Sequence, residues 1–181
     1  MSAATIPQLL TVEEFEKLPA PSSGHYELHH GEVVLMSPPL QVHKRLERRL
    51  RVLLDDMAQA SGFLAETEFA YRPLPESEVW VGDVVCLPQT REQQIRKWLE
   101  GSPELVMEVK SSSNTKAELY DKAMTAIAGG GSVEFWIVDD KQRIVTVYSK
   151  ISGMHIYQDV QAVPVPMFNG QIDLVQLFEG L

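Results

Sequence analysis

The chain has 181 residues, of which 44% are hydrophobic and 23% are charged, the composition of an ordinary globular protein. This length predicts one domain, residues 1–181, with a substantial core. No apolar run approaches the ~20 residues of a membrane helix, and a single cysteine, Cys86, excludes an internal disulfide, so we expect a cytoplasmic protein. The formal net charge of −9 argues against nonspecific coating of nucleic acid, because such binding depends on phosphate neutralisation.

A short helix, a hairpin and a long helix are predicted in the first third of the chain. A capping box that starts at Thr11 predicts a short helix directly after it. Residues 26–28 and 32–36 predict a β-hairpin, in whose turn Gly31 supplies the positive φ. Over residues 41–60 apolar side chains recur at helical spacing, which predicts a long amphipathic helix.

Strands and helices alternate along the rest of the chain. The expected elements are strands at about residues 63–71, 79–87 and 105–110, a short helix or lid at 90–99, a helix at 116–128, strands at 133–138, 144–148 and 154–157, and a short helix that closes the tail 164–181. The central order of helix, three strands, helix and strand predicts an α/β fold with a mixed sheet flanked by helices.

Two of the predicted strands carry charged residues. Asp83 stands among apolar neighbours on both faces of its strand, where an unpaired carboxylate would cost several kcal/mol, so a cation should compensate it. Glu108 and Lys110 are two residues apart and project from one face of theirs. Asp83, Glu108 and the Val109 carbonyl could together hold Mg²⁺, with Lys110 beside the bound water. A solvent-facing strand surface for Glu108 and Lys110, and a cap or an arginine partner for Asp83, are the plainer alternatives.

Residues 43–51 form the dense basic run of the sequence. In a helix over residues 41–60, Arg45, Arg48 and Arg49 lie mainly opposite the apolar stripe and could contact phosphates, together with His43 at the start of the run. The alternative is that these arginines pair with nearby carboxylates or line a subunit interface.

Several segments resemble one family. The stretch YELHHGEVVLMSPP at residues 26–39, the following His43, EVKS at 108–111 and EFWIVD at 134–139 resemble the Uma-type family of bacterial endonucleases, within the PD-(D/E)XK nuclease superfamily. The similarity spans roughly residues 11–148. It implies a restriction endonuclease-like core of αβββαβ order with an N-terminal β-hairpin. It also implies a Mg²⁺-dependent endonuclease acting on DNA, with Mn²⁺ as a substitute and RNA not excluded.

The same resemblance implies roles for individual residues. Asp83 and Glu108 would bind the metal, Lys110 would act at the water, and Glu27 would add a carboxylate, unless it forms a cross-strand salt bridge in the hairpin. Lys122 matches a helix lysine that relatives carry when the strand lysine is replaced, and because this chain has both, the choice stays open. A homodimer is also implied. The rival interpretation is a catalytically inactive module that binds nucleic acid or assembles.

Overall fold

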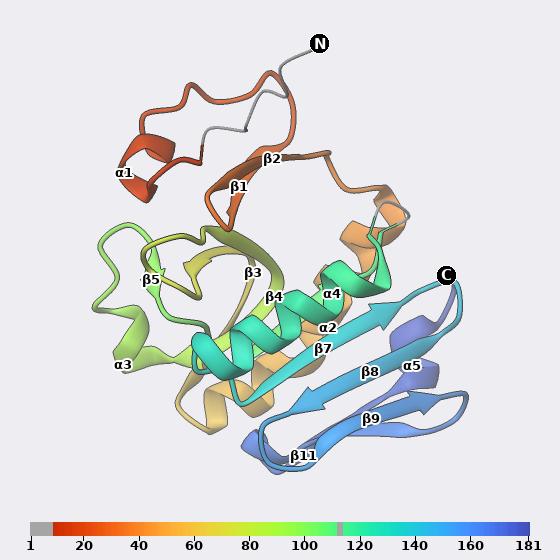
Figure 1. Ribbon diagram of the computed structural model, residues 1–181. Coiled ribbons are helices and arrows are strands. Elements are labelled where there is room, and N and C mark those ends of the chain that lie inside the picture. Colours follow the sequence, from red (N-terminus) through yellow and green to blue (C-terminus); the bar gives the residue numbers. More distant parts are fainter. Residues whose placement is uncertain (1–8, 112–113) are drawn as a thin grey trace.

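A seven-stranded mixed sheet forms the centre of the protein, in the spatial order β5-β3-β4-β6-β7-β8-β9 (Figure 1). The computed structural model describes residues 9–111 and 114–181. Neighbouring strands run antiparallel except for the β3–β5 and β6–β7 pairs, which are parallel. The strands are β3 (Phe63–Arg72), β4 (Trp80–Pro88), β5 (Leu99–Glu100), β6 (Leu105–Val109), β7 (Glu134–Asp139), β8 (Ile144–Ser149) and β9 (Gly153–Gln158). The predicted mixed sheet is confirmed.

Helices cover both faces of this sheet, as predicted. On one face, Leu46, Leu50 and Leu54 of α2 (Gln41–Ala60) pack with α5 (Leu174–Phe178). On the other face lie Ala123 of α4 (Lys116–Met124) and Ala126 of the turn that follows it. Among the described residues every helix is too short or too polar to cross a lipid bilayer. The helices are α1 (Val12–Phe15), α2 (Gln41–Ala60), α3 (Gln89–Glu92), α4 (Lys116–Met124), which continues as a π-helical turn (Thr125–Gly129), a 3₁₀ turn (Pro166–Phe168), and α5 (Leu174–Phe178).

The predicted N-terminal hairpin joins β1 (His25–His29) to β2 (Glu32–Met36). Its two turn residues, His30 at φ 51° and Gly31 at φ 82°, both have the positive φ that a tight hairpin turn of this length favours. An isolated bridge between Leu28 and Val79 fixes the hairpin beside the start of β4. The hairpin therefore holds the side chains of β1 against the central sheet.

Two segments differ from the sequence-based expectations. The helix or lid expected over residues 90–99 is the short α3 followed by β5, because Leu99 is buried and pairs with Tyr71 in β3. In the tail, β10 (Ala162–Val165) and β11 (Gly170–Asp173) form a hairpin ahead of the predicted final helix. Prolines at positions 164 and 166 obscure that hairpin in the sequence, because proline argues against a strand.

Candidate active site

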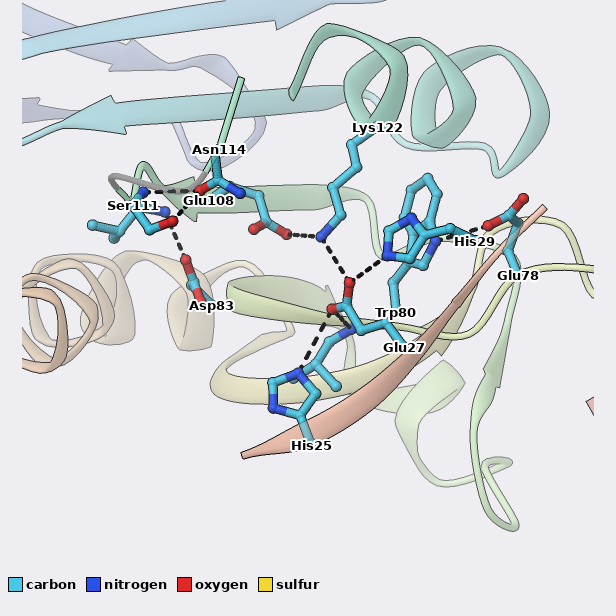
Figure 2. Close-up of polar contacts among 12 residues, drawn as sticks. His25, Glu27, His29, Glu78, Trp80, Asp83, Glu108, Ser111, Asn114 and Lys122 are labelled. Atoms are coloured by element: carbon cyan, nitrogen blue, oxygen red, sulfur yellow. Dashed lines mark hydrogen bonds and ion pairs between the residues drawn. The ribbon is translucent and has the colours of Figure 1, made fainter. Parts of the chain in front are cut away.

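Four elements bring the charged side chains of the site together. The antiparallel pairing of β4 with β6 places Asp83 beside the end of β6, where the Val109 amide donates to Asp83 Oδ2 at 2.7 Å. From α4, Lys122 points towards two carboxylates (Figure 2). Its Nζ lies 3.5 Å from Oε1 of Glu108 in β6 and 3.2 Å from Oε2 of Glu27 in β1. Asp83, Glu108, Glu27 and Lys122 thus gather at one end of the sheet.

Lys110 lies outside this group. Val109 pairs with Val138 in the parallel β6–β7 ladder, so the next residues, Lys110 and Asp139, are cross-strand neighbours. The Lys110 Nζ lies 2.6 Å from Asp139 Oδ2, and no ion pair joins Lys110 to Glu108 within the described residues. Strand alternation predicts a shared face for Glu108 and Lys110, but the ammonium of Lys110 pairs with Asp139 of the neighbouring strand. The geometry therefore favours Lys122, and not Lys110, as the lysine that pairs with the carboxylates of Glu27 and Glu108.

Glu27 is held ionised in a buried position, with only 1% of its surface exposed. Burial opposes its ionisation, but the ammonium of Lys122, the hydrogen bond with His29 and the nearby His25 ring hold the pKa of Glu27 well below its usual range. The Val81 amide also donates to Glu27 Oε1 at 2.8 Å. Glu27 is therefore a fixed negative charge that neutralises and orients Lys122, and it does not form the cross-strand salt bridge within the hairpin that sequence left open.

Glu108 has the opposite electrostatic character. Burial raises its pKa to about 8, against the opposing effect of Lys122, and the nearby charges of Asp83 and Glu27 raise it further. Its Oε1 is shielded from solvent and accepts no hydrogen bond from the described part of the chain. Burial also opposes the charge of Lys122, but Glu108, Glu27 and Asp83 together raise the pKa of Lys122. The site thus has an excess of carboxylates for its one buried lysine.

His29, Trp80 and Glu78, which were not recognised in the sequence, form a chain of contacts that begins at Glu27. His29 Nε2 lies 2.7 Å from Glu27 Oε2, and the His29 ring stacks on Trp80 with centroids 5.5 Å apart (Figure 2). Trp80 in turn donates from Nε1 to the buried Glu78 at 2.9 Å. The sequence Glu78-Val79-Trp80 does not by itself indicate these contacts, because His29 and Glu27 lie in the hairpin about 50 residues earlier in the chain.

His43 lies beside Asp83 and is half-buried, not on the open surface of α2. Its Nε2 is 3.0 Å from Asp83 Oδ2 and 3.0 Å from Oε1 of Glu47, one helical turn further along. Burial opposes protonation of His43, but the adjacent carboxylates of Asp83 and Glu47 outweigh it and raise its pKa to about 10. Glu47 went unrecognised in the sequence, although its i+4 spacing from His43 places both on one side of the helix.

The arginines of the basic run divide into two kinds. Arg45 and Arg48 are exposed on α2 and remain candidates for phosphate contacts. Arg49 instead reaches the end of α5, where its Nη1 donates to the carbonyl oxygens of Leu177 at 2.8 Å and Glu179 at 2.6 Å. Helix C-termini leave carbonyls unsatisfied, so this placement favours a structural role for Arg49.

Replacing Arg49 by alanine should therefore destabilise the fold. Hydrogen bonds to a charged group contribute about 1.5–3 kcal/mol, and we expect Arg49→Ala to lower the free energy of unfolding by about 2 kcal/mol. Arg48→Ala, one residue away and exposed, should change it by less than about 0.5 kcal/mol. Urea unfolding followed by circular dichroism measures both. Equal stability of the two variants would contradict the capping role.

The fold and this site together define a restriction endonuclease-like α/β protein. Comparison with family models matches Uma2, described as "Putative restriction endonuclease", over residues 12–181, and the chain belongs to this family. A search of curated proteins found no match. Among solved structures, the chain is similar to a protein from Anabaena variabilis ATCC 29413 described as a "putative nuclease belonging to DUF820". The TM-score is 0.81 at 19% identity, over 93% of this chain and 97% of the other, a likeness that shows the fold. A DrdV–DNA complex matches at a TM-score of 0.39 and 16% identity, over 66% of this chain and 12% of that one.

Proposed function

We propose that this protein is a divalent-metal-dependent endonuclease that hydrolyses phosphodiester bonds of DNA. The observation that carries the proposal is the convergence of Glu108 and Glu27 on the buried Lys122, with the charge of Asp83 close enough to raise the pKa of Lys122 as well. Carboxylates that crowd together in a buried site need a cation, and Lys122 alone faces both Glu27 and Glu108, so the pKa of Glu108 stays raised at about 8. Membership of a family of nucleases points in the same direction.

Asp83, Glu108 and the Val109 carbonyl are the groups that would hold Mg²⁺, or Mn²⁺ in its place. Oxygen ligands of this kind suit both ions, which keep several waters in addition to protein ligands. The fit rests on Glu108, whose Oε1 is buried without a hydrogen bond from the described residues and whose pKa burial raises to about 8. An ion at this position would replace the missing positive charge. When bound, it would polarise the phosphate and lower the pKa of a water.

Lys122 is the residue that would act on the reacting groups. Its ammonium, held by Glu27 at 3.2 Å, can donate to an attacking water or to a non-bridging phosphate oxygen and stabilise the negative charge that develops there. Hydrolysis forms a bond from the water oxygen to phosphorus and breaks the bond to the 3′ oxygen. The water gives up a proton and the 3′ oxygen takes one, so the products are a 5′-phosphate and a 3′-hydroxyl. Glu27 acts through Lys122 and is a positioning residue.

Other features complete the proposal. Arg45 and Arg48, exposed on α2, are placed to contact the DNA backbone. We further infer that residues 1–181 act as one domain, because all the described elements lie on or beside one sheet. A homodimer, in which two sites address two strands, and a cytoplasmic location stay predictions from the sequence.

A cleavage assay tests this function directly. Purified protein is incubated with supercoiled plasmid, single-stranded DNA and RNA, each with Mg²⁺, Mn²⁺ or EDTA. We expect plasmid cleavage with either ion and none with EDTA, and Asp83→Asn should abolish it while it leaves the fold intact by circular dichroism. Cleavage of RNA alone would move the substrate from DNA to RNA.

A catalytically inactive nucleic-acid-binding or assembly module is the alternative. It predicts that wild-type protein binds DNA, with no cleavage under any of these conditions and no difference between wild-type protein and Asp83→Asn. The buried Glu27, Glu108 and Lys122, with the partly exposed Asp83 nearby, favour the enzyme, because a module has no need to keep buried charges together.

A further inference from the structure

We propose that His43, Glu47 and Asp83 form a mixed nitrogen and oxygen site for a divalent transition-metal ion, in which His43 supplies a nitrogen ligand. Asp83 is common to this site and to the oxygen ligands of the proposed function, on which the inference rests. The new content is the class of ion: an imidazole ligand favours transition metals over Mg²⁺, which prefers an all-oxygen shell.

The distances between the candidate ligand atoms fit one bound ion. Nε2 of His43 lies 3.0 Å from Asp83 Oδ2 and 3.0 Å from Glu47 Oε1, and the three ligand atoms all lie within 4.8 Å of one another. Adjacent ligands about 2.1 Å from an octahedral ion are separated by about 3 Å. The side chains could therefore close on an ion with small movements.

Nε2 of His43 makes no well-aligned hydrogen bond within the described part of the chain, although two carboxylate oxygens face it. A ring nitrogen carries one hydrogen at most, yet Nε2 of His43 faces two carboxylate oxygens at equal distance. Nε2 itself is shielded from solvent. Glu47 is only 3% exposed; its Oε2 pairs with Lys44 at 3.4 Å, and its Oε1 is the oxygen that faces His43. A divalent ion that displaces the proton of Nε2 would bind this nitrogen and the two facing oxygens at once.

Rigid elements hold the ligands in place and leave a path for the ion. His43 and Glu47 are one turn apart on α2, whose Leu46 and Leu50 are fully buried in the core. Asp83 is held by the Val109 amide at 2.7 Å. The side chains of Asp83 and His43 are 18% and 13% exposed, which leaves one side open to solvent and to water ligands. Such preorganisation is typical of metal sites.

Two measurements besides cleavage test the site. In protein loaded with Mn²⁺, electron spin echo spectra should contain nitrogen modulations that change when histidine alone is labelled with ¹⁵N, and His43→Gln should abolish them. Calorimetry should show that His43→Ala and Glu47→Gln weaken Mn²⁺ binding about 10- to 100-fold, with a smaller effect of His43→Ala on Mg²⁺. His155→Ala is the matched control, because His155 lies exposed on β9.

The outcomes separate this inference from the proposed function. Nitrogen modulations that His43→Gln removes would support the site. If Mn²⁺ binds and Asp83→Asn abolishes binding, but no nitrogen modulation is present, His43 is not a ligand and the proposed function survives without it. If neither Mn²⁺ nor Mg²⁺ binds the wild-type protein, the His43 site and the proposed metal-dependent function are both wrong. Thermal melts in EDTA identify any variant that fails to fold, and His43→Gln, which keeps a hydrogen-bonding side chain, guards against that loss.

Discussion

Replacing Lys122 by alanine is expected to lower the cleavage rate about 10²- to 10⁴-fold, the usual contribution of a well-placed electrostatic or acid–base group. Lys122 contacts Glu27 and Glu108, and under the proposed function its ammonium would stabilise the negative charge that develops on the phosphate. Lys110→Ala should keep most of the activity, because the ammonium of Lys110 lies 2.6 Å from Asp139 and not on the site carboxylates.

Stability has to be measured in parallel with rate. Removing Lys122 leaves two buried carboxylates without their cation, and breaking a buried ion pair in this way costs about 3–5 kcal/mol. Lys122→Met keeps the apolar stem of the side chain, so its rate at a temperature well below its melting point isolates the loss of charge. If Lys110→Ala lost most of its cleavage activity while folded Lys122→Met kept full activity, Lys110 and not Lys122 would be the lysine that assists cleavage.

The fold was largely predictable from the sequence because its signals are local. Apolar spacing over residues 41–60 reproduces α2 to the residue, and the turn chemistry of Gly31 predicts the β1–β2 hairpin. Where the prediction was wrong, a distant partner decided the structure. Leu99 belongs to a strand because it pairs with Tyr71, a contact that no window of residues 90–99 contains.

The site was less predictable for the same reason. Period-2 alternation gives the face on which Lys110 lies, but only the order of strands in the sheet reveals that Asp139 is its neighbour. Likewise, the helical pattern puts Arg49 opposite the apolar stripe, yet its carbonyl partners lie about 130 residues later in the chain. A charged residue in sequence indicates a need for a partner, and the topology determines which partner it receives.

Replacing Glu108 by glutamine is expected to stabilise the protein when metal is absent. Burial raises the pKa of Glu108 to about 8, so between about pH 4.5 and 8 the folded state retains a proton that the unfolded state releases. Stability from this group is therefore present below pH 4.5 and falls as the pH rises through 8. Glutamine does not titrate, and in EDTA the advantage of Glu108→Gln should grow from pH 5 to pH 8, where it reaches on the order of 4 kcal/mol.

With divalent metal bound, the wild-type protein should be more stable than Glu108→Gln. An ion that binds only the folded state at 100 times its dissociation constant adds about 2.7 kcal/mol of stability, and a glutamine oxygen is too weak a ligand to recover it. Melting curves of wild-type protein and Glu108→Gln at pH 5 and pH 8, each in EDTA and in Mn²⁺, measure both effects. Asp139→Asn is the matched control, because Asp139 pairs with Lys110 and its pKa is lowered despite burial, through hydrogen bonds with Lys110 and backbone amides. If Mn²⁺ raised the melting temperature of Glu108→Gln as much as that of the wild type, Glu108 would not be a metal ligand, and its raised pKa would reflect burial alone.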